Sequence, residues 1–96
     1  MAAFVATYTY ATDSAERRSG RLDDHLAFID RLETDGVLQL VGKVEDASVD
    51  VLFVLRADSL DAATSALQAD PYREIGAIDA VTIHPWNAKR GVLGPI

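Results

Sequence analysis

The stretch DVLFVLR, residues 50–56, decides the fold of this 96-residue chain. In a strand, its alternation places Val51, Phe53 and Leu55 on one face and Leu52 and Val54 on the other. A sheet with helices on only one side usually has a polar second face. Because both faces of this strand are apolar, we expect a second copy of the chain to cover the open face. The expected assembly is a homodimer whose sheets pack face to face.

Three further stretches are expected to form strands beside this one. The stretch VLQLVGKV, residues 37–44, is joined to it by the turn EDAS, residues 45–48, to make a hairpin. The stretch AFVATYTY, residues 3–10, is rich in β-branched and aromatic residues, as strands are. The last strand is DAVTIHPW, residues 79–86. The chain therefore contains four expected strands.

A helix is expected between the first two strands. It begins near Asp13 or Ser14, either of which can cap it, and ends at Gly36. Gly20 weakens the first half of this helix, which allows a break before Arg21. The stripe expected to face the sheet consists of apolar residues at helical spacing, namely Leu22, Leu26, Ile29 and Leu32.

A second helix is expected between the third and fourth strands, with Ser59 as its cap. Its apolar stripe consists of Leu60, Ala63 and Leu67. The helix ends before Pro71, since proline forces the preceding residue out of the helical region. The resulting order β-α-β-β-α-β is the ferredoxin-like α+β plan. We expect one domain, residues 1–96, with a four-stranded antiparallel sheet and both helices on one face.

The composition restricts the partners and the location of the protein. Acidic residues number 15 against 9 basic ones, for a formal charge of -6, and such a surface repels nucleic acid and anionic membranes. No apolar run reaches the length of a membrane span, and the N-terminus lacks a signal pattern. We therefore expect a cytoplasmic protein with no nucleic-acid or membrane partner. The absence of cysteine excludes disulfides and thiolate chemistry.

His25 is the most informative polar residue, because helical spacing places it within the apolar stripe of the first helix. A histidine there is either a core side chain satisfied by a backbone carbonyl or, beside a carboxylate, an acid–base group. Arg21 lies one turn before it and Arg18 one turn earlier, so the three side chains follow one edge. Arg21 is then either a solvated partner of nearby carboxylates or a binding group for a substrate carboxylate or enolate.

Asp70 also has two interpretations. Before Pro71 it either caps the short turn that follows or orients a histidine as the second member of a general acid–base pair. His84, near the end of the last strand, is either an interface residue or part of a site. Four aromatic residues either line a pocket or belong to the core, namely Tyr8, Tyr10, Tyr72 and Trp86. Neither metal-ligand spacing nor a cofactor motif is present, so we expect no metal and no cofactor.

The order and spacing of several short motifs resemble the YciI-like, or YCII-related, family. These motifs are Arg21-x-x-x-His25-Leu26, Gly36, Gly42, Ser59-Leu60-x-Ala62-Ala63, Ala69-Asp70-Pro71-Tyr72, Gly76 and Val81-x-Ile83-x-Pro85-Trp86. Together they extend over nearly the whole chain. The resemblance implies a ferredoxin-like fold that dimerises through its sheet into a dimeric α+β barrel.

The resemblance also implies an active site at His25 and Asp70, with Arg21 nearby. We expect a small cofactor-free isomerase or lyase, similar to the dehydrochlorinases of one branch of the family. Its substrate would be a small acidic metabolite that is unsaturated or derived from an aromatic ring. The expected substrate contacts are Arg21, Tyr8, Tyr72 and His84. The alternative is a module that binds a small molecule or dimerises without catalysis.

Overall fold

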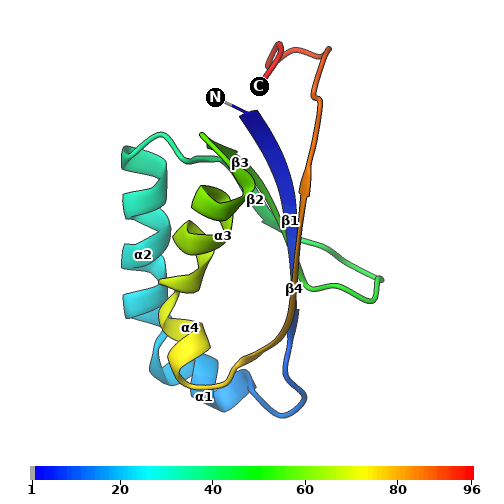
Figure 1. Ribbon diagram of the computed structural model, residues 1–96. Helices are drawn as coiled ribbons and strands as arrows, with labels where there is room; N and C mark the ends of the chain where they lie inside the picture. Colours follow the sequence, from blue (N-terminus) through cyan, green and yellow to red (C-terminus); the bar gives the residue numbers. More distant parts are fainter. Residues whose placement is uncertain (1) are drawn as a thin grey trace.

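The computed structural model describes residues 2–96 and contains a four-stranded antiparallel sheet with the strand order β2-β3-β1-β4. The strands are β1 (Ala2–Tyr10), β2 (Leu38–Lys43), β3 (Val51–Ala57) and β4 (Ile78–Pro85). The helices are α1 (Ala15–Gly20), α2 (Leu22–Thr34), α3 (Leu60–Gln68) and α4 (Pro71–Glu74). All of these helices lie on one side of the sheet (Figure 1). The predicted ferredoxin-like α+β arrangement is confirmed.

The core lies between the central strands and the helices. Antiparallel pairing sets Ala6 of β1 opposite Phe53 of β3, so both side chains face the helices. Phe53 and Tyr8 are fully buried there, against Phe28 of α2 and Leu67 of α3. The alternation of apolar residues in β1 and β3 therefore selects the face that the helices cover.

The first expected helix is divided in two at Arg21, as the weak position at Gly20 allowed. Arg21 has φ −120° and ψ 15°, which is outside the helical region, and it separates α1 from α2. Helix α2 ends before Gly36, whose φ of 77° favours glycine because a side chain would be strained there. Both ends of α2 are thus set by local sequence.

The predicted sheet-facing stripe of α2 is wrong in its first half. Leu22 is 45% exposed and Leu26 is 48% exposed, whereas Phe28 and Leu32 are buried. The helix is rotated so that His25, Phe28 and Leu32, spaced by three and four residues, point toward the sheet. The large Phe28 side chain takes the central contact with the core, which leaves the two leucines on the flank of the helix.

The sheet face away from the helices retains apolar surface. Leu52 of β3 is 39% exposed, and Leu40 of β2 is also exposed. Val54 on the same face is buried, and it lines a cavity of about 360 Å³ together with Leu93 and Ile96 of the C-terminal segment. The end of the chain therefore covers one part of this face, while Leu52 and much of Leu40, which also lines this cavity, stay exposed.

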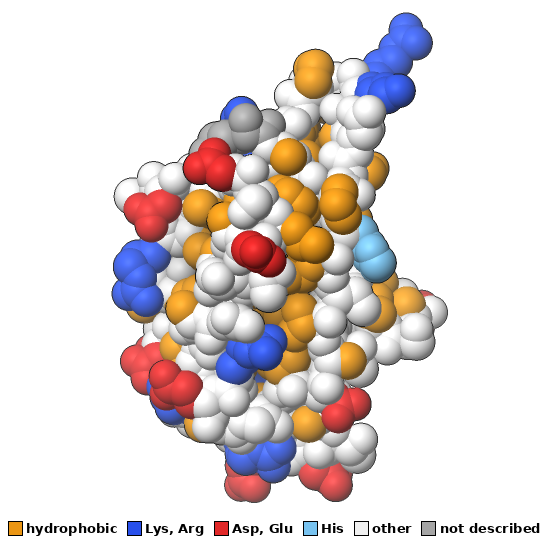
Figure 2. Space-filling model, viewed as in Figure 1, with side chains coloured by type: hydrophobic (Ala, Val, Ile, Leu, Met, Phe, Trp, Pro, Cys, Tyr) orange, Lys and Arg blue, Asp and Glu red, His pale blue; other side chains and the backbone are white. Residues whose placement is uncertain are grey.

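The surface mixes charges of both signs. Figure 2 shows carboxylates and cations interspersed with apolar side chains over the visible face, without a large area of one sign. Within residues 2–96, no helix is both long enough and apolar enough to cross a membrane. The visible face therefore carries no single acidic patch.

Candidate active site

Asp70 occupies the junction between α3 and α4. Its backbone is extended, with φ −63° and ψ 124°, as expected before a proline, and Pro71 takes the first helical position of α4. The Oδ1 atom of Asp70 accepts a hydrogen bond from the backbone N–H of Tyr72 at 2.9 Å. Asp70 therefore caps α4, and the cap holds the carboxylate in a fixed orientation inside the fold.

The Asp70 carboxylate is 0% exposed and is surrounded by donors. Its Oδ1 atom also lies 2.9 Å from Nδ1 of His25. The hydroxyl of Tyr8 donates a hydrogen bond to Oδ2 at 3.0 Å. A buried carboxylate is stable only with such partners, because it loses its hydration on folding. The cap and the contact with a histidine, which the sequence left as alternatives, occur together.

His25 is oriented by contacts on two sides. Its ring stacks on Tyr72, with the centroids 4.0 Å apart and the planes 1° from parallel. Because Oδ1 of Asp70 is an acceptor, Nδ1 of His25 carries the proton and the lone pair of the neutral ring lies on Nε2. Among the described residues Nε2 has no hydrogen-bond partner, yet it is not sealed from solvent. The side chain, 13% exposed, thus keeps its basic nitrogen available.

Tyr8 and Tyr72 support this pair from the interior. Burial raises the pKa of the Tyr8 hydroxyl, and the negative charge of Asp70 raises it further. The hydroxyl therefore stays protonated and acts as a donor. Burial also raises the pKa of Tyr72. Both side chains are buried, Tyr8 completely. The structure thus brings both tyrosines to the His25–Asp70 pair, and their contact with a substrate stays a prediction.

Arg21 does not join this pair. Its Nε atom donates to Asp24 at 2.9 Å and its Nη2 atom donates to Glu74 at 3.1 Å. The hydrogen bond to Glu74 raises the pKa of the guanidinium most, and the hydrogen bond to Asp24 adds to this effect. The helix break at Arg21 turns the side chain toward these surface carboxylates. The structure therefore does not bring Arg21 to the pair, and its side chain takes the solvated alternative beside surface carboxylates.

His84 lies on the opposite side of the sheet. It pairs with Val5 of β1, and Val5 alternates with the helix-facing residues Phe4 and Ala6. His84 is exposed on this face, so the sheet separates it from His25 within one chain. Within one chain the structure does not bring His84 to the His25–Asp70 pair, because residues of opposite parity in a strand point to opposite faces.

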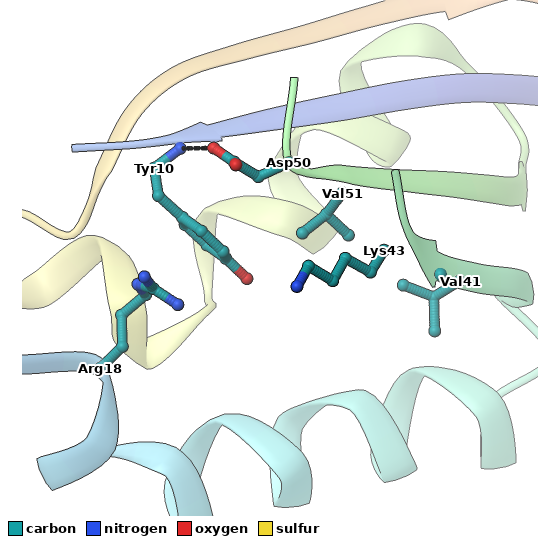
Figure 3. A pocket seen from close by; sticks show the side chains of 7 residues that line it. Tyr10, Arg18, Val41, Lys43, Asp50 and Val51 are labelled. Atoms are coloured by element: carbon teal, nitrogen blue, oxygen red, sulfur yellow. Dashed lines mark hydrogen bonds between the residues drawn. The ribbon is translucent and has the colours of Figure 1, made fainter. Parts of the chain in front are cut away.

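A cavity of about 470 Å³ lies between the helices and the end of the β2–β3 hairpin (Figure 3). Its walls include Tyr10, Arg18, Val41, Lys43, Asp50 and Val51. The Arg18 guanidinium stacks over the Tyr10 ring, with its central carbon 4.0 Å from the centroid. Oδ2 of Asp50 accepts a hydrogen bond from the backbone N–H of Tyr10 at 2.7 Å. We call this space the Tyr10 cavity.

Two aromatic rings connect the Tyr10 cavity to the His25–Asp70 pair. The ring of Tyr10 meets the ring of Tyr72 edge to face at 6.1 Å, and Tyr72 stacks on His25. Helical spacing singled out Arg18, whereas nothing in the sequence marked Lys43. Lys43 reaches the cavity because the fold brings the end of β2 and helix α1 to the same space. In the part of the chain that the structure describes, no group of three His, Asp or Glu residues is arranged to hold a metal ion.

The fold and the buried pair define a ferredoxin-like α+β domain with a candidate acid–base site. The sequence matches the YCII-related domain family over residues 2–87, so the chain belongs to that family. The predicted family is confirmed. No protein with a curated description matches the sequence.

Several solved structures share the fold. The 5-chloro-2-hydroxyhydroquinone dehydrochlorinase of Burkholderia phenoliruptrix AC1100, in complex with 2,5-dihydroxybenzoquinone, is 21% identical, with a TM-score of 0.76. The match covers 96% of this chain and 98% of that one. Protein Atu4242 of Agrobacterium tumefaciens is 17% identical over 94% of this chain and 95% of its own, with a TM-score of 0.59. An uncharacterized NIPSNAP domain protein of Burkholderia xenovorans is 16% identical over 100% of both chains, with a TM-score of 0.57.

Proposed function

We propose that the protein is a small cofactor-free enzyme in which His25 moves a proton on a small acidic metabolite. The observation that carries this proposal is the 2.9 Å contact between His25 Nδ1 and the buried Asp70 carboxylate. Asp70 orients the imidazole and stabilises the imidazolium that forms when Nε2 accepts a proton. Tyr8 holds Asp70 in turn through its hydroxyl.

Arg18 takes the role that the sequence suggested for Arg21. Its Nε atom donates to Ser14 Oγ at 3.1 Å and its plane rests on Tyr10, so the guanidinium is held in one place. Its terminal nitrogens have no hydrogen-bond partner among the described residues. A guanidinium held in this way binds a substrate carboxylate or stabilises an enolate.

The reaction class follows from where the proton and the electron pair go. Removal of a proton by Nε2, followed by its return at another atom, is an isomerisation. Removal of a proton with departure of a neighbouring chloride is an elimination. The electron pair left by the proton forms the new double bond, and the electrons of the carbon–chlorine bond leave on chloride. The activity named for the dehydrochlorinase of similar fold favours elimination from an aromatic-derived acid or phenol.

The test measures both outcomes in one set of variants. Exchange of carbon-bound protons in deuterated water is followed by NMR for a panel of small unsaturated acids, and chloride release is followed with 5-chloro-2-hydroxyhydroquinone. His25→Gln and Asp70→Asn should each lower turnover by about 100-fold or more. His84→Gln is the matched control, because His84 is exposed on the other face of the sheet, and it should leave turnover unchanged.

A second readout isolates the orienting role of Asp70. Long-range ¹H–¹⁵N spectra distinguish protonated from unprotonated imidazole nitrogens. Wild-type His25 should carry its proton on Nδ1, and Asp70→Asn should produce a mixture of tautomers, with His84 as the internal reference. Turnover that survives His25→Gln would sink the proposal. Binding of acids without exchange or chloride release would leave a non-catalytic binding module.

We also propose that two copies of the chain pair through the sheet face away from the helices. Leu40 and Leu52 expose apolar surface there, and Arg56 on the same face has a buried Nε with no partner among the described residues. Leu52→Asp should shift the protein to monomers in sedimentation velocity experiments. Leu26→Asp, on the exposed flank of α2, is the matched control and should not change the sedimentation coefficient. A dimer that persists in Leu52→Asp would contradict this pairing.

A further inference from the structure

The Tyr10 cavity contains two cations that lack carboxylate partners. Neither Arg18 nor Lys43 forms an ion pair with any described residue, although acidic side chains outnumber basic ones in the whole chain. The single carboxylate of the cavity, Asp50, is engaged by the backbone N–H of Tyr10. The cavity therefore has an excess of positive charge inside a protein of net charge -6.

The two cations stand on opposite sides of Tyr10. Figure 3 shows the Arg18 guanidinium beside the Tyr10 ring and the Lys43 ammonium near the far end of the ring, toward which the hydroxyl points. Arg18 extends from α1 and Lys43 from the end of β2, so they enter the cavity from different elements. Val41 and Val51 supply an apolar wall beside Lys43. The cavity thus has a cation at each end and an aromatic and aliphatic middle.

We infer that the Tyr10 cavity binds a small acid with two anionic groups, one held by Arg18 and the other by Lys43. This inference goes beyond the proposed function, because it concerns a cavity whose lining does not include His25 and names the class of small molecule that this cavity would bind. The volume of about 470 Å³ lies in the range of small-molecule sites. Arg18 holds the group nearer to the His25–Asp70 pair, because its neighbour Tyr10 contacts Tyr72. Lys43 determines specificity by binding the second, distant group.

The probes are terephthalate and 4-methylbenzoate, which share a flat ring and one carboxylate and differ in the group at the far end. Binding to the full chain is measured by isothermal titration calorimetry at low and at moderate salt. Terephthalate should bind about fivefold or more tightly than 4-methylbenzoate, and the difference should shrink as salt is added. Lys43→Met should remove this preference while leaving the affinity for 4-methylbenzoate unchanged.

Three further variants keep the test specific. Lys43→Arg retains the cation and should retain the preference for terephthalate. Lys89→Met removes the other lysine, which lies in the C-terminal segment, and should behave as wild type. His25→Gln should keep both affinities, because His25 does not line the cavity, so loss of turnover in this variant reports on the proposed function alone.

Two results would overturn the inference. One is equal affinity for the two probes, or no binding of either at millimolar concentration. The other is a preference for terephthalate that persists in Lys43→Met. Neither result bears on whether His25 transfers a proton, which the exchange and chloride measurements decide separately.

Discussion

Replacing Asp70 with alanine should destabilise the fold, mainly because of the donors left behind. The Tyr8 hydroxyl and the Tyr72 backbone N–H both donate to this carboxylate, and both lie in the interior. A buried donor without a partner costs about 1–3 kcal/mol, so the two together cost about 2–6 kcal/mol. Domains of this size are stable by about 5–15 kcal/mol, which makes Asp70→Ala a severe but measurable change.

The same contacts predict that Asp70 and Tyr8 are energetically coupled. Tyr8→Phe removes the hydroxyl and leaves Asp70 with two donors, so it should cost only about 1 kcal/mol. The double variant has no buried hydroxyl without an acceptor, because the Tyr8 hydroxyl is removed together with the Asp70 carboxylate. The double variant should therefore lose about 1–3 kcal/mol less than the sum of the single variants.

The assay is urea denaturation followed by far-ultraviolet circular dichroism for the four proteins of this cycle. The control cycle is Tyr10→Phe with Asp50→Ala. Asp50 accepts from the backbone N–H of Tyr10 and not from its hydroxyl, so these losses should add. Additive losses for Tyr8 and Asp70 would refute the assignment of Tyr8 as a partner that holds the carboxylate.

Three other predictions test the pH response, the backbone and the choice of arginine. Burial raises the pKa of Tyr8 in the folded protein, so above pH about 10 the unfolded chain loses a proton that the folded chain keeps, and stability falls. Tyr8→Phe should make this fall shallower by about 1.4 kcal/mol per pH unit, and equal slopes in urea titrations would contradict the burial of the hydroxyl. Gly20→Ala should stabilise the end of α1 by about 1 kcal/mol, because alanine favours the helix more than glycine does. Gly76→Ala should destabilise the fold by about 1 kcal/mol in the same urea assay, because φ at this position is 66°. Once a substrate is identified, Arg18→Met should raise its KM about tenfold or more, whereas Arg21→Met should not, and the reverse pattern would return the binding role to Arg21.

Local chemistry explains why most of the fold was predictable from the sequence. Alternation in residues 50–56 marks a strand with two apolar faces, and Gly36 and Pro71 end helices through their own backbone preferences. The Ser59 cap is likewise local, because its side chain accepts from the N–H of Ala62 at 3.0 Å. Such signals involve residues only a few positions apart, so they appear in the sequence without knowledge of the packing.

The faces of the helices were less predictable. Apolar spacing is compatible with more than one rotation of α2, and burial of Phe28 decided which rotation fits the sheet. That rotation left Leu22 and Leu26 exposed and kept His25 pointing inward. In the same way, the break between α1 and α2 directed Arg18 toward Tyr10 and Arg21 toward surface carboxylates.

The sequence alone was enough to identify the candidate pair, because the family motifs include both His25 and Asp70. The sequence did not determine the distance between the His25 and Asp70 side chains, because these residues lie 45 positions apart. The contact of Tyr8 with Asp70 was equally hidden, because these two residues lie 62 positions apart. Only the packing of α2 and α4 against the sheet brings these three groups into hydrogen-bond contact. The same packing places Lys43 opposite Arg18, because a cavity is formed by elements that are distant in the chain and carries no signal in any one of them.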